Sequence, residues 1–357
     1  MVVPLADADA RCGAKAAHLG RLLRAGFPVP GGFVIDDPRA GGWEDELAPA
    51  LRALGRGPFA VRSSAHGEDG SEASFAGQLH TTLNAATPAR VTEAVRRAAA
   101  SGGGEEATAY AARTGRPACA LVPVIVQVMV DPDAAGVAFT RHPVTGADQV
   151  VIEATAGLGD GLVDGSVTPE RWTLDGEAAA GPRGAGVLTE RQARALAGVA
   201  RRIEGLFGRP QDIEWAVAGG KVWVLQARPI TTTPRTAIRP VTTAGRVLVA
   251  GTAAGPGSAA GRVRLITGLD DFGRFAAGDV LVCRTTSPAW TPLLARAAAV
   301  MTETGGMLAH AAIVAREFGI PAVLAAEGAM TVLADGRPVV VDGTGGTVTA
   351  ADEEPAR

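Results

Sequence analysis

The sequence contains few lysines and cysteines and has no long apolar run. Lys15 and Lys221 are the only lysines among 34 basic residues, so each is a candidate for a specific role. Cys12, Cys119 and Cys283 lie far apart without metal-ligand spacing, which predicts reduced thiols in a cytoplasmic protein. No apolar run approaches the ~20 residues that span a bilayer. The N-terminus has neither the basic region nor the apolar core of a signal peptide.

The composition that remains is typical of a soluble globular protein. The 357 residues suffice for two or three domains, each with its own core. Hydrophobic residues make up 47% of the chain, and the net charge is −3. This balance favours neither a nucleic-acid partner nor a membrane partner.

The stretch 300–323, VMTETGGMLAHAAIVAREFGIPAV, is the part of the chain richest in chemical signals. Its pattern predicts a short strand over residues 297–301, a Gly-Gly turn, and a helix over about residues 307–318. Gly319 would end this helix, because glycine readily adopts the left-handed conformation found after helix ends.

His310 would then lie in the first turn of that helix. Amide groups and the helix dipole favour an anion at this position, and they keep the imidazole neutral. One ring nitrogen could therefore capture a phosphoryl group, while the turn that contains Gly305 and Gly306 could hold the phosphate oxygens. A lone histidine at a helix start is also often only a polar residue, and this interpretation stays open on the residues alone.

The whole segment resembles the phosphohistidine signature of the phosphoenolpyruvate-utilising family, which includes phosphoenolpyruvate synthase, pyruvate phosphate dikinase and rifampin phosphotransferase. The likeness extends over more than twenty consecutive positions. It implies that His310 becomes phosphorylated and that Thr285 and Thr291 lie in the loop beside it. Ala309 departs from the family, which has Ser or Thr before the histidine, and this change removes a hydroxyl that could bond the phosphate.

Two segments near the N-terminus resemble the ATP-binding part of the same family. CGAKAAHLGRLL, starting at Cys12, predicts a helix with Lys15 in its first turn, and FAVRSSAHGEDGSEASFAGQ, starting at Phe59, predicts a strand that runs into a polar loop. The resemblance implies that Lys15 and Arg62 bind nucleotide phosphates and that residues 71–78 cover the nucleotide. A surface lysine and a solvated loop are the alternatives.

The β-branched run VPVIVQVMV over residues 122–130 predicts a buried strand. The resemblance implies an ATP-grasp fold, in which this strand leads to the hinge that carries adenine. Backbone groups of Gln127, Met129 and Val130 would then bind the base. A plain core strand is the alternative, and both interpretations can hold together.

The stretch 211–230 predicts two strands joined by a Gly-Gly turn. Alternate residues of a strand share a face, so Asp212 and Glu214 point the same way, as do Gln226 and Arg228. Oxygen ligands beside a cationic fork suit Mg²⁺ and a triphosphate. By resemblance, Glu214 and Gln226 hold Mg²⁺ and all three of Glu214, Gln226 and Arg228 contribute to ATP binding. A structural ion pair is the alternative.

Residues 150–170 also resemble the family, and Glu153 within them is either an acid near the ligand or a structural residue. The predicted fold class is α/β, with an ATP-grasp domain over residues 1–232 and a swivelling β/β/α phosphohistidine domain over 247–351. A linker over 233–246 and a tail over 352–357 complete this division.

By analogy with the family, we expect a dikinase-type phosphotransferase. His310 would attack the β-phosphorus of ATP, AMP would leave, and the outer phosphate would be lost before the remaining phosphoryl group passes to an acceptor. No stretch is left over for an acceptor domain, so the acceptor would be a small molecule or a separately encoded domain or protein. The alternatives are an ATP-grasp ligase of a biosynthetic pathway and a subunit of a split phosphoenolpyruvate synthase-like enzyme.

Overall fold

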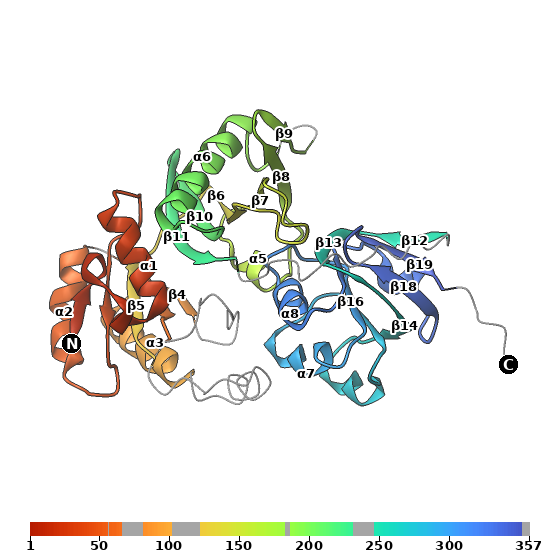
Figure 1. Cartoon of the computed structure of the whole chain (residues 1–357). Coiled ribbons are helices and arrows are strands. Elements are labelled where there is room, and N and C mark those ends of the chain that lie inside the picture. Colours follow the sequence, from red (N-terminus) through yellow and green to blue (C-terminus); the bar gives the residue numbers. More distant parts are fainter. Residues whose placement is uncertain (56, 66–80, 102–121, 183–185, 231–245, 352–357) are drawn as a thin grey trace. The chain divides into compact units, whose positions relative to one another are not determined.

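The computed structural model describes the chain except residues 56, 66–80, 102–121, 183–185, 231–245 and 352–357 (Figure 1). The predicted cover loop, nearly all of the predicted linker, and the tail lie outside the described residues. The chain divides into two compact units. The first comprises Met1–Thr140, Ala156–Leu158 and Leu188–Thr231, and the second comprises Arg141–Thr155, Gly159–Val187 and Thr232–Arg357.

These units differ from the predicted domains in one respect, since most of residues 141–187 group with the C-terminal part of the chain. The predicted boundaries at 232 and 247 stay a prediction. No helix among the described residues is both long enough and apolar enough to cross a membrane.

The first unit contains a five-stranded antiparallel sheet in the order β1-β2-β5-β3-β4. Helices α2 and α3 pack with this sheet around a core that contains Trp43 and Ile35. α2 covers Trp43–Leu54, with Trp43, Leu47 and Leu51 buried along one face, and it begins after Gly42, whose φ is +80°. The predicted strand at 122–130 is confirmed as the central strand β5.

The second sheet of the first unit joins β6, β10 and β11 in antiparallel pairs. β10 and β11 form the predicted hairpin, with Gly219 and Gly220 at positive φ in its turn. The elements of this unit are the strands β1 (Val2–Pro4), β2 (Gly32–Ile35), β3 (Phe59–Ser63), β4 (Thr81–Ala85), β5 (Val124–Val128), β6 (Ala134–Phe139), β10 (Gln211–Ala218) and β11 (Lys221–Pro229), and the helices α1 (Gly13–Arg24), α2, α3 (Pro88–Ala100) and α6 (Glu190–Phe207).

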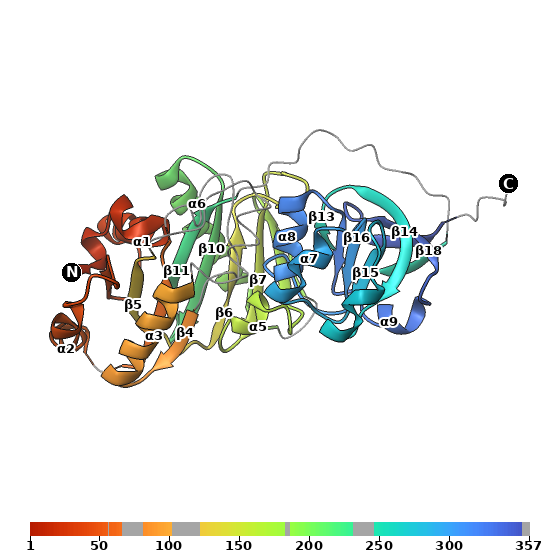
Figure 2. The ribbon, with the colours of Figure 1, turned by 90° about the horizontal axis from the view of Figure 1, so that it is seen from below.

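The second unit contains an eight-stranded sheet in the order β12-β19-β18-β14-β15-β16-β17-β13. Its centre, β14 to β17, is parallel, because each of these pairs is joined by a crossover. Figure 2 shows α7 and α8 beside β15 and β16. Two apolar clusters fill the unit, one around Leu294 and Val300 and the other around Val282 and Met301.

The segment 141–187 adds β7, β8 and β9, which pair antiparallel in that order. The elements here are the strands β7 (Val150–Ala156), β8 (Glu170–Asp175), β9 (Ala178–Ala180), β12 (Val247–Ala250), β13 (Thr252–Gly255), β14 (Ser258–Leu265), β15 (Val280–Cys283), β16 (Ala299–Thr302), β17 (Ala322–Leu324), β18 (Pro338–Asp342) and β19 (Thr347–Ala350), and the helices α5 (Asp160–Val163), α7 (Thr291–Leu294), α8 (His310–Phe318) and α9 (Ala329–Val332).

α8 begins three residues later than predicted. It starts at His310, and the preceding Ala309 has an extended ψ of 147°. Residues 307–309 therefore belong to the turn, although their side chains favour helix. The predicted end is confirmed, since Gly319 caps the helix with φ +68°.

Candidate functional site

The first group of predicted site residues lies where β3 meets the hairpin of β10 and β11. Glu214 and Gln226 are cross-strand partners in this hairpin. The Arg62 guanidinium donates to the Glu214 Oε2 at 2.7 Å and to the Gln226 Oε1 at 2.5 Å. It also donates to the Leu225 carbonyl at 3.0 Å, so one arginine joins β3 to β11 and contacts both predicted metal ligands.

Arg228 and Asp212 form the neighbouring cross-strand pair, at 2.9 Å. Burial alone would raise the pKa of Glu214, but the charges of Arg62, Arg228 and Lys15 outweigh burial and lower this pKa. The Arg62 hydrogen bond acts in the same direction. The structure therefore brings Lys15, Arg62, Glu214, Gln226 and Arg228 into one cluster with an ionised carboxylate, and we call these five residues the basic cluster.

Lys15 reaches this cluster because α1 begins against the end of β3. The Ser64 hydroxyl accepts from the Ala16 amide at 3.0 Å and donates to the Cys12 carbonyl at 2.8 Å. Gly13 allows this approach, since it has φ +81° and any Cβ there would overlap the Ser64 carbonyl oxygen at 1.7 Å. Ser64 was not singled out from the sequence, although its place two residues after Arg62 was a usable signal.

His18 fixes the other side of α1, and no pattern in the sequence pointed to this residue. Its Nδ1 lies 3.0 Å from the Ala227 carbonyl, between Gln226 and Arg228, and must donate because a carbonyl only accepts. Its ring also meets Phe207 edge-on at 5.1 Å. α1 and β11 are thereby held together next to the basic cluster.

Several hydrogen-bonding groups of the predicted adenine segment already bond to other parts of the protein. The Gln127 side chain is buried and donates to the Pro30 carbonyl at 2.9 Å. The amides of Val128 and Met129 donate to the carbonyls of Gly31 and Pro58. These amides hold the sheet together, which leaves the Met129 carbonyl and the Val130 amide as the backbone groups on which the predicted contact to a base would depend.

The oxygens of Glu214 and Gln226 are the ligand type that Mg²⁺ prefers. No cluster of three or more His, Cys, Asp or Glu side chains suited to a metal is found among the described residues. A Mg²⁺ ion held here would therefore take its other ligands from phosphate oxygens or water. The oxygens of Glu214 and Gln226 fit a Mg²⁺ site that is completed by phosphate or water oxygens.

The second group of predicted site residues lies in the second unit, around the start of α8 (Figure 1). His310 is only 4% exposed. Its Nδ1 lies 2.9 Å from the Thr286 hydroxyl, and its Nε2 lies 3.3 Å from the Thr291 hydroxyl. The imidazole is thus held between two threonines that precede it in the chain.

Thr291 was predicted to border the histidine, whereas Thr286 was not. Thr285, which the resemblance also implied to lie in the loop beside the histidine, directs its hydroxyl to the carbonyls of Asp164 and Gly165. Of these two consecutive threonines, only Thr286 contacts the ring.

Burial lowers the pKa of His310 to about 4. The imidazole is therefore neutral near pH 7 and keeps a lone pair on one ring nitrogen. This is the ionisation state that a nucleophilic histidine requires.

Glu153 is the buried acid that supports the turn before His310. Its carboxylate is fully buried, pairs with Arg171, and accepts from the Met307 amide at 2.8 Å. A Cβ on Gly306 would lie 2.4 Å from the Glu153 Oε2, so only glycine permits this approach. Gly305 has φ +104°, which also favours glycine. Glu153 was predicted to be either an acid near the ligand or a structural residue, and these contacts are structural.

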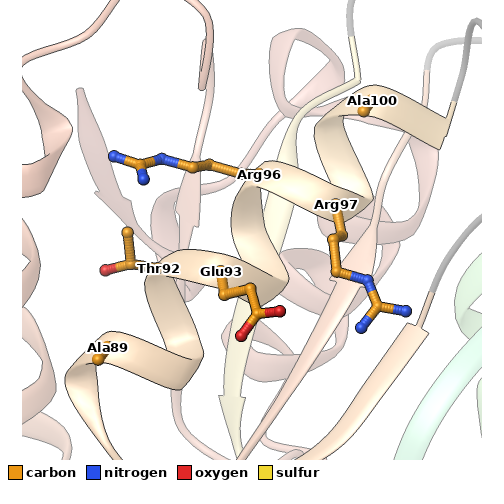
Figure 3. A pocket seen from close by; sticks show the side chains of 6 residues that line it. All are labelled: Ala89, Thr92, Glu93, Arg96, Arg97 and Ala100. Carbon is orange, nitrogen blue, oxygen red and sulfur yellow. The ribbon is translucent and has the colours of Figure 1, made fainter.

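Two hollows lie on separate elements. A cavity of about 550 Å³ in the second unit is lined in part by Arg284, Thr286, Ser287 and Trp290, and Thr286 is the residue whose hydroxyl contacts the His310 Nδ1. Another hollow has a volume of about 520 Å³. Figure 3 shows the side chains that line it. Its lining side chains all come from one face of α3, and none of the predicted site residues is among them.

Comparison with known families matches both parts of the chain. The family described as "Pyruvate phosphate dikinase, AMP/ATP-binding domain" matches residues 42–180 and 176–245. The family described as "PEP-utilising enzyme, mobile domain" matches residues 275–346. The second range contains His310, and the first contains the basic cluster apart from Lys15.

Several curated relatives are phosphoenolpyruvate synthases. The chain is 35% identical to a probable phosphoenolpyruvate synthase of Archaeoglobus fulgidus, over 97% of the chain and 58% of the relative. It is 38% identical to one of Methanothermobacter thermautotrophicus, over 94% and 61%. The phosphoenolpyruvate synthase of Escherichia coli is 34% identical, over 90% and 47%. The chain thus spans about three fifths of the length of the first two relatives.

A solved D-alanine-D-alanine ligase from Coxiella burnetii shares 14% identity, with a TM-score of 0.34 over 64% of this chain and 51% of the ligase. That likeness is too low to indicate function. The predicted fold class, an ATP-grasp domain followed by a phosphohistidine domain, is confirmed by the two family matches. Since the ATP-binding family alone matches more than half of the residues, the chain belongs to the family of phosphoenolpyruvate-utilising enzymes.

Proposed function

We propose that the protein is a dikinase-type phosphotransferase that passes the β-phosphoryl group of ATP through His310 to an acceptor. A nitrogen of His310 forms a bond to the β-phosphorus, the bond from that phosphorus to the bridging oxygen of AMP breaks, and AMP leaves. Water or phosphate then removes the outer phosphoryl group as inorganic phosphate or pyrophosphate. The phosphoryl group that stays on the ring is transferred to the acceptor.

The observation that carries this proposal is the state of His310. It is a neutral imidazole at the first position of α8, with both ring nitrogens in contact with hydroxyls. It also lies within the matched mobile domain. An uncharged imidazole keeps the nitrogen lone pair that a bond to phosphorus requires.

The basic cluster supports the nucleotide side of the reaction. Phosphoryl transfer depends on positioning and on neutralising charge, and Lys15, Arg62 and Arg228 supply three cations around Glu214. Mg²⁺ between Glu214, Gln226 and the phosphates would supply further charge neutralisation when bound. The catalytic step then requires the second unit to bring His310 to the nucleotide.

The acceptor is proposed to be a small molecule or a separate acceptor protein. The cavity lined in part by Thr286 has room for a small molecule, and the Thr286 hydroxyl also contacts the His310 ring. The relatives named above are phosphoenolpyruvate synthases, so pyruvate is the first acceptor to test.

The test is labelling with ATP that carries a radioactive β-phosphorus, in the presence of Mg²⁺. We expect acid-labile label on the wild-type chain, with AMP formed in equal amount, and no label on His310→Ala. The matched control is His142→Ala, which removes a half-buried histidine of the same unit and should still be labelled. Label that persists on His310→Ala would refute the nucleophile, and ADP in place of AMP would favour a ligase-type reaction.

A second step tests the acceptor. Labelled wild-type protein is freed from nucleotide and mixed with pyruvate. Transfer of the label to pyruvate would show that the chain needs no partner, whereas label that stays on His310 until a separate protein is added would show a partner-dependent acceptor.

A further inference from the structure

The two threonines around His310 differ in what their hydroxyls can do. The Thr291 hydroxyl lies 2.8 Å from the Pro288 carbonyl oxygen, which can only accept a hydrogen bond. A hydroxyl has a single hydrogen, and the Thr291 hydroxyl donates it to the Pro288 carbonyl oxygen. Towards the His310 Nε2, 3.3 Å away, Thr291 can therefore only accept.

This assignment fixes the proton on the ring. If Thr291 accepts, the Nε2 of His310 must carry the hydrogen. A neutral imidazole has one N–H, so Nδ1 is bare and holds the lone pair. The Thr286 hydroxyl, 2.9 Å from Nδ1, then donates. Both hydrogen bonds to the ring agree with the Nε2–H tautomer, and the contact between Thr291 and Nε2 conflicts with the Nδ1–H tautomer.

We propose that Thr291, oriented by the Pro288 carbonyl, holds His310 as the Nε2–H tautomer, and that Thr286 supplies the matching donor to Nδ1. Both are positioning residues for the phosphohistidine. The effect on phosphoryl transfer rests on the proposed function, but the tautomer is a property of the resting protein and does not.

The two threonines are not equivalent in this arrangement. Thr286 can also accept from Nδ1 if its hydroxyl rotates, whereas Thr291 cannot donate to Nε2 while Pro288 holds its hydrogen. Thr291 is therefore the residue that decides the tautomer. Without it, a buried Nε2–H would have no acceptor, which costs free energy, and the proton would move to Nδ1 to reach Thr286.

The isosteric variants Thr291→Val and Thr286→Val test this difference. ¹⁵N-histidine-labelled full-length protein is studied near pH 7 by proton–nitrogen correlation NMR, which distinguishes a protonated ring nitrogen from a bare one. His310 is assigned by the signals lost in His310→Gln. We expect the Nε2–H pattern in the wild type and in Thr286→Val, and a change to the Nδ1–H pattern in Thr291→Val.

Two controls keep the result interpretable. Thr291→Ser retains the hydroxyl and should keep the wild-type pattern. Thr304→Val removes a hydroxyl that donates to the Gly165 and Arg284 carbonyls rather than to the ring, so it should also keep the pattern. The signals of the remaining histidines report whether each variant is folded.

An Nδ1–H pattern in the wild type would overturn the inference, as would an unchanged pattern in folded Thr291→Val. Neither result depends on ATP. Failure of the labelling experiment would refute the proposed function while leaving the tautomer intact, so the two failures can be told apart.

Discussion

At the scale of single residues, His310 shows how burial changes the chemistry of a side chain. A histidine in water is half protonated near pH 6.5, whereas burial lowers the pKa of His310 to about 4. The unfolded chain therefore binds a proton at this residue at a pH at which the folded chain does not. The contribution of His310 to stability is complete above about pH 6.5 and is lost as the pH falls towards 4.

This difference predicts a pH-dependent loss of stability. Between pH 7.5 and pH 5, the wild type should lose about 2 kcal/mol more of its free energy of unfolding than His310→Gln, which does not titrate. Urea unfolding at the two pH values measures both losses. His142, whose pKa is lowered by burial and by the charges of Arg171 and Arg316, titrates in both proteins and cancels in the comparison. Equal losses would show that His310 is not buried in solution.

At the scale of elements, the turn before α8 is built around the carboxylate of Glu153. The Met307 amide and the close approach of Gly306 both depend on it. The turn is thus set by a contact between β7 and the start of a helix that lies 154 residues later in the chain.

Gly306→Ala tests this packing. The added methyl group would lie 2.4 Å from the Glu153 Oε2 and 2.6 Å from the Pro169 Cγ, so we expect a loss of about 1–3 kcal/mol in the free energy of unfolding. Gly268→Ala is the matched control, because a Cβ there meets nothing within 4 Å and its φ is extended. Urea unfolding of the two variants measures the difference.

A double-mutant cycle then assigns the cause. In a Glu153→Ala background the cost of Gly306→Ala should be smaller, since one of the two clashing groups is gone. An undiminished cost, or equal costs for the two glycine variants, would contradict the contact.

The same elements show what the sequence predicts well. The hairpin follows from local patterns, and alternation along it predicts that Asp212 shares a face with Glu214, and Gln226 with Arg228. The register of the strands then pairs Glu214 with Gln226 and Asp212 with Arg228. The start of α8 does not follow, because its extended Ala309 conflicts with local helix propensity and Met307 is bonded to a distant residue. The choice between Thr285 and Thr286 depends on which way each faces, and the sequence does not fix that.

At the scale of the whole molecule, the chain has two compact units with separate cores. Leu47 belongs to the core of the first unit and Leu294 to that of the second, and both are buried. The sequence predicted two domains, yet it could not predict that a segment from the middle of the chain groups with the C-terminal unit. That grouping depends on long-range contacts such as the one made by Glu153.

Separate cores predict separate responses to substitution and to ligand. Leu47→Ala and Leu294→Ala should each cost about 2–5 kcal/mol, in different unfolding transitions. ATP with Mg²⁺ should raise only the transition that Leu47→Ala lowers, because a ligand stabilises the unit that binds it. Calorimetry of the full-length variants with and without nucleotide measures this. A single transition lowered by both variants would contradict it.

The bridge from Arg62 to Glu214 and Gln226 has a consequence for how a ligand enters. The Glu214 Oε2 and the Gln226 Oε1 already accept from the Arg62 guanidinium. A metal ion alone would therefore have to displace this guanidinium, and no phosphate would be present to accept from Arg62 in exchange. A nucleotide alone would draw Arg62 away from Glu214 and leave only the charges of Arg228 and Lys15 to balance the carboxylate. The metal and the triphosphate binding together would give each of these groups a partner, so the resting protein should bind either one alone more weakly than the pair.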